Sequence, residues 1–338
     1  MKEKQITKVL LTTSIMIFIV FLSVGQMSGE DLSTLKISLL PYISSAPFFI
    51  ALEEGYFAEQ GIKLEFMEFK QPGLTTPALA RGDLDVSTDS IGSSLFSAIA
   101  RGLEIKIVAD KGHFSDRCMS SAIMVRKALY DSGEITKIEH LQGRKVSLSL
   151  IPVWGYVYEQ ILSKGNLTLD DIEIVKMPTA ARITALETGS IDAAGATDPD
   201  VKKMESLGIA VAIANYQDSV PNYQSSTVIY GPNLLEKNPE LGKKFMIAYL
   251  KGVRQYNKGK TQRNLEIIHK HTGLDLDILK EICFISFHPD GHVNTQYIPA
   301  VQDWAYEKGY IDSKITLEEL IDMSFAEYAN EVLERKDM

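Results

Sequence analysis

The chain has 338 residues, of which 45% are hydrophobic and 23% are charged, and its formal net charge at pH 7 is -9. This apolar content excludes a disordered chain and, at usual domain sizes, supports two compact units. The acidic balance excludes a nucleic-acid-binding role, which calls for a basic surface.

Residues 1–25 have the layout of a secretory signal peptide. Lys2, Lys4 and Lys8 precede an apolar run over residues 9–24, and small residues stand at positions 23 and 25. We predict cleavage after Gly25, with a retained membrane anchor as the alternative, because the run is shorter than the ~20 residues of a spanning helix. Either outcome places the body of the chain outside the cytoplasm, in the periplasm.

One pattern occurs twice after this leader, starting at Lys36 and again at Lys145. Each copy predicts a strand that ends at a proline, a helix closed by a glycine, a second strand, and a helix that runs through a Gly-x-x-Asp step into a third strand. That step begins at Gly82 in the first copy and at Gly189 in the second. Right-handed crossovers turn each β-α-β-α-β unit into a parallel sheet flanked by helices.

The duplication predicts an α/β fold of two similar lobes with a ligand cleft between them. We expect two crossover strands to join the lobes, and the C-terminal part of the chain to be mainly helical and to return to the first lobe. The expected segments are lobe 1 at 34–119 and 227–338, lobe 2 at 120–226, and the hinge strands at 121–125 and 226–230.

Ligands of open α/β sheets bind beyond the carboxyl ends of the strands, where loops lead into helix N-termini. Free N–H groups at such helix starts favour a carboxylate, a sulfonate or another partial negative charge on the ligand. The loops that meet this description cover residues 41–47, 87–92, 151–156 and 195–200.

Several segments resemble one family of proteins. They are Ser45-Ala-Pro-Phe-Phe-Ile-Ala-Leu-Glu-Glu-Gly-Tyr-Phe-Ala-Glu-Gln-Gly61, Ala80-Arg-Gly-Asp-Leu-Asp85, Leu141-Gln-Gly-Arg-Lys-Val146 and Asp198-Pro199. Together they are similar to the importer-associated solute-binding proteins of the nitrate, sulfonate, taurine and thiamine-pyrimidine group. The resemblance implies a periplasmic-binding-protein-like fold that closes on a small solute and delivers it to the membrane permease of an ABC importer. A Trp often precedes the Asp-Pro pair in this group, whereas Thr197 stands there in this chain.

The resemblance leaves two alternatives open. Enzymes that make the thiamine pyrimidine are similar in fold, but their cysteine-rich signature is absent from this sequence and the leader argues against a cytoplasmic enzyme. An extracellular sensor would present its closed form to a receptor in place of a permease. We expect a monomer without catalysis and without a cofactor.

The candidate ligand-binding residues lie on the cleft loops and next to the crossovers. Aromatic side chains from both lobes could sandwich a planar solute, and an arginine or aspartate could bind its polar groups. A pyrimidine-like heterocycle is preferred, with sulfonates or taurine next. The candidates are Tyr42, Ser44, Ser45, Phe48, Asp89, Ser90, Arg117, Pro152, Trp154, Tyr156, Asp198 and Tyr223.

Some candidates have a structural alternative. Phe48 could pack in a core, Asp89 could cap the following helix, and Arg117 could pair with Asp116. Asp198 could be an N-cap with Pro199 at the first helical position.

The cysteines and histidines give no strong signal for disulfide or metal chemistry. Cys118 and Cys283 could form a disulfide in an oxidising compartment, but we expect two free buried thiols. His288 and His292 flank a Pro-Asp-Gly turn, so their rings need not converge and no metal site is expected. The sequence also contains none of the G-x-S-x-G, H-E-x-x-H or nucleotide-binding glycine motifs.

Overall fold

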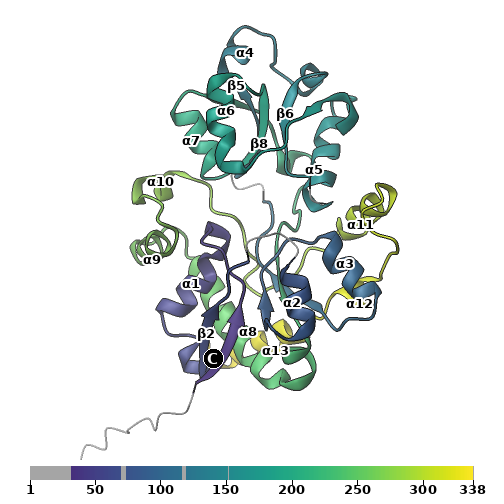
Figure 1. Cartoon of the computed structure of the whole chain (residues 1–338). Helices are drawn as coiled ribbons and strands as arrows, with labels where there is room; N and C mark the ends of the chain where they lie inside the picture. Colours follow the sequence, from purple (N-terminus) through teal and green to yellow (C-terminus); the bar gives the residue numbers. More distant parts are fainter. Residues whose placement is uncertain (1–31, 70–73, 116–118, 151, 338) are drawn as a thin grey trace, which may run out of the picture. The chain divides into compact units, whose positions relative to one another are not determined.

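A computed structural model describes residues 32–69, 74–115, 119–150 and 152–337, apart from the side chains of residues 152, 336 and 337 (Figure 1). The predicted signal peptide lies outside these residues, and so do Arg117 and Cys118. Among the helices in these ranges, none is long and apolar enough to cross a membrane.

The first sheet has the strand order β2-β1-β3-β10-β4. β1 pairs in parallel with both β2 and β3, whereas β10 is antiparallel to its neighbours β3 and β4. The strands are β1 Ser33–Ile37, β2 Ile62–Phe66, β3 Val86–Ser87, β4 Lys106–Asp110 and β10 Thr227–Tyr230. We refer to this sheet with its helices as lobe 1.

The second sheet, which defines lobe 2, has the order β7-β6-β8-β5-β9. β6 pairs in parallel with β7 and β8, and β5 is antiparallel to β8 and β9. The strands are β5 Ser121–Arg126, β6 Lys145–Ser147, β7 Glu173–Ile174, β8 Ala193–Thr197 and β9 Ala210–Asn215.

The predicted sequence repeat corresponds to two equivalent units, β1-α1-β2-α2-β3 and β6-α5-β7-α6-β8. The Gly-x-x-Asp step has the same role in both. Gly82 and Gly189 end their helices at φ 76° and 74°, a left-handed conformation that suits glycine. Three residues later, Asp85 and Asp192 accept hydrogen bonds from the backbone N–H groups of Lys36 and Lys145, at 2.7 and 3.0 Å. The helices are α1 Ala46–Glu53, α2 Thr75–Arg81, α5 Pro152–Ser163 and α6 Arg182–Thr188.

Two crossover segments connect the lobes, and each leads into the antiparallel strand of the sheet that it enters. The first precedes β5 and the second precedes β10, so the predicted hinge strands belong to the sheets themselves. The crossovers also pair with each other: Phe114 N–H donates to the Tyr223 carbonyl at 3.0 Å, and Ser225 N–H donates to the Gly112 carbonyl at 3.0 Å. This pairing gives the joint two hydrogen-bonded chain segments in place of a single flexible linker.

The remaining helices flank the sheets. α8 is amphipathic and packs its apolar face against α1 and α13 in the lobe 1 core. This contact is close, since a Cβ atom on Gly252 would lie 2.2 Å from the Pro47 carbonyl oxygen. The helices are α3 Ser93–Ala100, α4 Lys127–Asp131, α7 Asp200–Ser206, α8 Pro239–Tyr256, α9 Gln262–Thr272, α10 Leu276–Glu281, α11 Ile298–Glu307, α12 Leu317–Leu320 and α13 Ser324–Asp337.

α11 is the part of the C-terminal segment that reaches lobe 2, where it packs on α5. Trp304 lies against Gly155, and Lys308 forms a 3.0 Å ion pair with Glu159. The expectation that this segment returns to lobe 1 therefore describes α8 and α13, whereas α11 packs on lobe 2.

Candidate functional site

The loop between β1 and α1 carries polar groups at the N-terminus of α1. Ser45 is the N-cap residue, yet its hydroxyl is fully buried and makes no cap hydrogen bond or other hydrogen bond within the described part of the chain. The neighbouring Ser44 hydroxyl accepts a 3.2 Å hydrogen bond from the Lys111 ammonium. Both serines were predicted from the sequence, whereas Lys111 was not.

Lys111 is a buried cation at the start of the first crossover. Burial lowers the pKa of its amine from 10.5 to about 8, although the negative charges of Asp89 and Asp110 oppose that change. No carboxylate of a described residue forms an ion pair with it within 4.0 Å. Lys111 directly follows the apolar strand β4 and precedes the segment that crosses between the lobes. This position in the sequence could have indicated a residue at the site.

Asp89 and Ser90 lie in the loop after β3. The Asp89 carboxylate accepts a hydrogen bond from the Ser87 hydroxyl, and the Asp89 carbonyl accepts one from the Thr227 N–H at 2.8 Å. The alternative that Asp89 caps α3 is wrong, because Gly92 is the N-cap residue of that helix. Ser90 is half-buried in the same loop.

An aromatic cluster occupies the region where the lobes and the second crossover meet. The rings of Tyr156 and Tyr223 are nearly parallel, with centroids 6.3 Å apart and planes at 13°. Tyr297 lies beside both rings, at 6.4 and 5.6 Å. The Trp154 ring packs 5.9 Å from Phe114, which in turn lies 5.8 Å from Tyr223. The predicted residues Trp154, Tyr156 and Tyr223 are thus brought together, whereas Tyr297 was missed because it lies far along the chain.

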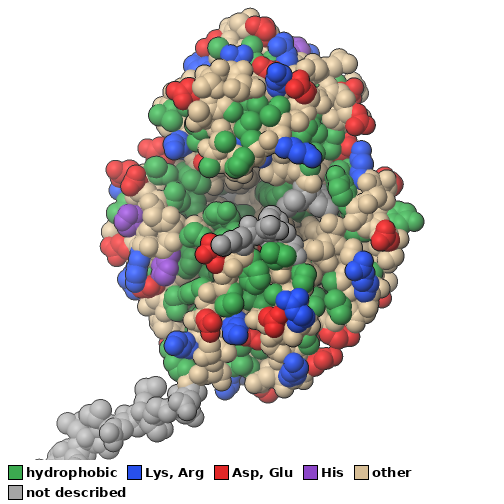
Figure 2. All heavy atoms as spheres, viewed as in Figure 1, with side chains coloured by type: hydrophobic (Ala, Val, Ile, Leu, Met, Phe, Trp, Pro, Cys, Tyr) green, Lys and Arg blue, Asp and Glu red, His purple; other side chains and the backbone are tan. Residues whose placement is uncertain are grey.

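A small enclosed cavity adjoins this cluster. Its volume is about 10 Å³, room for about one water molecule. The lining residues are Ile91, Val153, Tyr223, Gln224, Asn294, Tyr297, Ile298 and Val301. An organic solute can therefore enter this place only if the surrounding segments separate. On the face drawn in Figure 2, hydrophobic side chains border the hollow near the middle of the molecule.

Two of the predicted aromatic residues lie outside the aromatic cluster in this structure. Phe48 is 1% exposed and stacks on Tyr249 at 4.4 Å, because α1 turns this side chain into the lobe 1 core. Tyr42 is 60% exposed at the loop surface. The expected sandwich of these two rings against Trp154 and Tyr156 is not formed, and Tyr223 faces Tyr156 instead.

Asp198 lies at a second, larger cavity of about 310 Å³. Its carboxylate accepts hydrogen bonds from the N–H groups of Cys283 at 2.7 Å and Lys202 at 3.3 Å, and so connects lobe 2 to the segment after α10. Burial raises the pKa of Asp198, and these two N–H donors oppose that effect. The N-cap alternative is not realised, since Pro199 occupies the N-cap position of α7.

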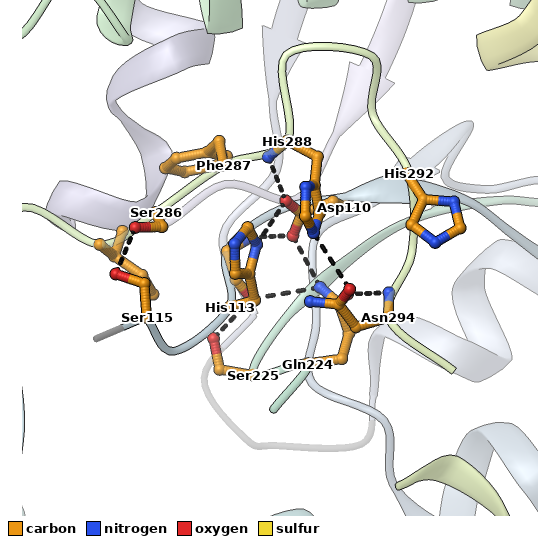
Figure 3. A network of polar contacts seen from close by, with 12 residues as sticks. Asp110, His113, Ser115, Gln224, Ser225, Ser286, Phe287, His288, His292 and Asn294 are labelled. Atoms are coloured by element: carbon orange, nitrogen blue, oxygen red, sulfur yellow. Dashed lines mark hydrogen bonds and ion pairs between the residues drawn. The ribbon is translucent and has the colours of Figure 1, made fainter. Parts of the chain in front are cut away.

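The two crossovers and the segment after α10 meet at the Asp110 carboxylate (Figure 3). One oxygen accepts from Gly112 N–H at 2.6 Å and Gln224 Nε2 at 2.7 Å. The other accepts from His113 Nδ1 at 3.0 Å and His288 N–H at 2.9 Å. All four acceptor positions of the carboxylate are therefore used by the protein itself.

The histidines of this network do not form a metal site in the arrangement observed. Donor atoms of Asp110, His113 and His288 lie within 4.8 Å of one another. However, the two imidazoles are stacked, with centroids 4.0 Å apart and planes at 15°. Nitrogen lone pairs lie in the ring planes, so two stacked rings cannot direct them at one ion.

Three further predictions concern residues that are partly or wholly outside the described structure. Cys283 is disulfide-bonded, so the expectation of two free thiols is wrong for this residue. Cys118, the other cysteine, and Arg117 lie outside the described residues. Pro152 begins α5, and its side chain is not described.

Two mixed α/β sheets joined by paired crossovers define the fold of periplasmic solute-binding proteins, and solved structures share it. The aliphatic sulphonate-binding protein SsuA of Escherichia coli is 18% identical, with a TM-score of 0.68 over 87% of this chain and 99% of the other. The nitrate-binding protein NrtA of Synechocystis is 15% identical, with a TM-score of 0.69 over 90% of each chain.

The chain belongs to the NMT1/THI5-like family, whose model matches residues 43–258. This confirms the resemblance seen in the sequence.

The curated relatives are distant in sequence. A Brucella abortus binding protein is 24% identical over 229 residues, which cover 67% of each chain. The riboflavin-binding protein RibY of Chloroflexus aurantiacus is 23% identical over 65% of this chain and 61% of its own. The 4-amino-5-hydroxymethyl-2-methylpyrimidine phosphate synthase of Uromyces fabae is 28% identical over 47% of this chain and 42% of its own.

Proposed function

We propose that this protein is the extracytoplasmic solute-binding component of an ABC importer, which captures a small planar organic solute between its lobes and delivers it to a membrane permease. The observation that carries the proposal is the parallel pair of Tyr156 in lobe 2 and Tyr223 in the second crossover. These rings belong to segments that can separate and close again around a solute.

The relatives support the same role. The names of the Brucella and Chloroflexus proteins describe binding proteins, and the two solved structures are binding proteins for sulphonates and nitrate. These four proteins match a larger part of this chain than the Uromyces synthase does, which covers 47% of it, and this favours a binding role over an enzymatic one. They also favour the predicted location outside the cytoplasm.

The nearly parallel orientation of the two tyrosine rings, with planes at 13°, favours a flat solute. A ring held between two others needs planes about 7 Å apart, twice the ~3.5 Å distance of closest carbon contact. The 6.3 Å between Tyr156 and Tyr223 is a distance between ring centroids, and the adjoining cavity has room for about one water molecule, so the lobes must open before a ring can enter between them. Two parallel rings suit a pyrimidine-like heterocycle best, and the sulfonate and taurine classes come next.

Closure follows from where the solute makes its contacts. A solute that touches Tyr156 and Tyr223 together makes both contacts only when the lobes are closed, so its binding energy favours the closed population. A permease that recognises the closed form would then receive loaded protein.

The proposal is tested on the purified mature protein. Native mass spectrometry is expected to reveal a bound passenger, and small-angle scattering should show a smaller radius when the solute is added back. Tyr156→Ala should weaken binding by about tenfold or more, since stacking contributes ~1 kcal/mol beyond burial. Tyr130→Ala, at an exposed side chain on α4 of lobe 2, is the matched control. Equal losses in both variants, or no response to any planar solute, would refute the assignment.

One observation favours an enzyme of the pyrimidine-synthesis type as the second candidate. The buried Lys111 amine, with its pKa lowered to about 8 by burial, is a better nucleophile at neutral pH than an ordinary lysine. Such an enzyme would bind an aldehyde cofactor through a lysine. Pyridoxal phosphate added to the protein should leave the absorbance spectrum unchanged if the binding role is correct, and a new band lost in Lys111→Met would favour the enzyme.

A further inference from the structure

Within the part of the chain that the structure describes, two buried polar groups at the N-terminus of α1 lack the partners that their burial requires. The Ser45 hydroxyl is fully buried and has no hydrogen-bond partner within the described ranges. The Lys111 ammonium, 4% exposed, donates one hydrogen bond there, to Ser44. α1 is eight residues long and adds the positive end of its dipole to the same place.

The charged groups around Lys111 are engaged elsewhere. The Asp89 carboxylate, in the loop after β3, binds the Ser87 hydroxyl. The Asp110 carboxylate, at the end of β4, accepts four hydrogen bonds, from the residues described above. The His113 imidazole donates to the second oxygen of Asp110, whereas the His288 imidazole stacks on His113 and bonds to Asn294 Oδ1 through Nε2. Neither carboxylate lies within 4.0 Å of the ammonium.

A buried ammonium without an ion pair is costly, because desolvation is not repaid by a nearby charge. Proteins avoid such groups unless the charge is paired. An anion that reaches Ser44 and Ser45 would supply the missing partner, accept from both hydroxyls, and lie at the positive end of α1.

We propose that Lys111, Ser44 and Ser45 bind an acidic group of the solute, so that the transported molecule is a planar ring that carries a carboxylate or a sulfonate. This inference rests on the proposed function and adds the charge of the solute to it. Lys111 then determines specificity for the acid over the neutral amide of the same shape.

The amine gives the interaction a defined pH dependence. Lys111 is charged below its pKa of about 8 and neutral above it. The carboxylate and sulfonate of the probes keep their charge throughout this range. Affinity for the acid should therefore be constant below pH 7 and fall as the pH rises through about 8, whereas affinity for a neutral ring should not change over that interval.

The experiment compares two matched pairs of probes by titration calorimetry: a pyrimidine carboxylate with its carboxamide, and benzenesulfonate with benzenesulfonamide. The native protein is expected to bind each acid about tenfold to a hundredfold more tightly than its amide. Lys111→Met should abolish that preference and leave the pH profile flat, whereas Lys111→Arg should retain part of it. Lys127→Met, which removes an exposed lysine paired with Asp131, is the control and should behave as the native protein.

The outcomes separate this inference from the proposed function. Equal binding of acid and amide, or an acid preference that survives in Lys111→Met, overturns the inference and leaves a planar-solute binding protein intact. If none of the four probes binds, the inference is also overturned. The mass of a passenger in the native spectrum then tests the proposed function by itself. Ser45→Ala supplies an independent check, since it should weaken the acids and not the amides.

Discussion

The indole of Trp304 lies directly against Gly155, so that a Cβ atom at position 155 would come within 2.3 Å of its Cη2 atom. Trp304 is on α11, in the C-terminal segment, and Gly155 is on α5 of lobe 2. Because Gly155 has no side chain, α11 from the C-terminal segment can contact α5 of lobe 2.

Gly155→Ala should disturb this contact. We expect a loss of about 1–3 kcal/mol in the free energy of unfolding, because the methyl group overpacks a site that has no free space. The loss should be measured by urea denaturation.

Gly92→Ala is the matched control, since a methyl group at that position would lie 3.9 Å from its nearest neighbouring atom. Gly155→Ala combined with Trp304→Phe should recover part of the loss, because the smaller ring makes room. A Gly155→Ala protein as stable as the native one would contradict the close packing of α11 on α5.

Asp110→Asn should destabilise the joint between the lobes. Each oxygen of Asp110 accepts two hydrogen bonds, so the NH₂ group of the asparagine would face two donors whichever oxygen it replaces. On one side these donors are Gly112 N–H and Gln224 Nε2. We expect a loss of about 3 kcal/mol, because the buried hydrogen bonds to the charged group are broken on that side. The free energy of unfolding is measured in urea.

The control for this change is Asp277→Asn, at a side chain that is 92% exposed. Its effect should stay within ~0.5 kcal/mol. A similar small effect of Asp110→Asn would show that the network does not stabilise the fold.

Lys111→Met should make the unliganded protein more stable at neutral pH. The folded-state pKa of Lys111, about 8, lies below its ordinary value of 10.5, so the unfolded chain binds more protons between these values and stability rises with pH across that window. Below pH 8 the full penalty applies, which at 1.36 kcal/mol per pKa unit is about 3 kcal/mol.

This prediction is checked by measuring the free energy of unfolding of the native protein and of Lys111→Met in urea, at pH 7 and at pH 10. The gain of Lys111→Met should be large at pH 7 and smaller at pH 10. A gain that is the same at both values would mean that burial does not lower the pKa of Lys111.

The disulfide at Cys283 predicts that this thiol resists alkylation until a reductant is added. Reduction should lower the midpoint of thermal unfolding, since disulfides typically contribute 2–4 kcal/mol. Mass spectrometry of the alkylated protein measures the first effect and calorimetry the second. Cys283→Ser should give a protein with one alkylatable thiol and the same lowered midpoint in the presence or absence of reductant.

Much of the fold could be predicted from the sequence because it follows from local signals. The repeat that starts at Lys36 and Lys145 specified two β-α-β-α-β units, and the glycine steps at Gly82 and Gly189 end helices where they were expected. Each signal lies within a few residues of the element that it specifies, so no knowledge of distant contacts was needed. Membership of the family followed from similarly local motifs.

The tertiary structure alone decided which side chains share a site. Phe48 and Ser45 are three residues apart, yet one packs in a core and the other has a hydroxyl at the helix start with no hydrogen-bond partner among the described residues. Tyr297 joins Tyr156 only because α11 packs on α5. The direction of each side chain depends on which distant segment covers it, and that information is contained in the packing of the whole chain and not in any short stretch of it.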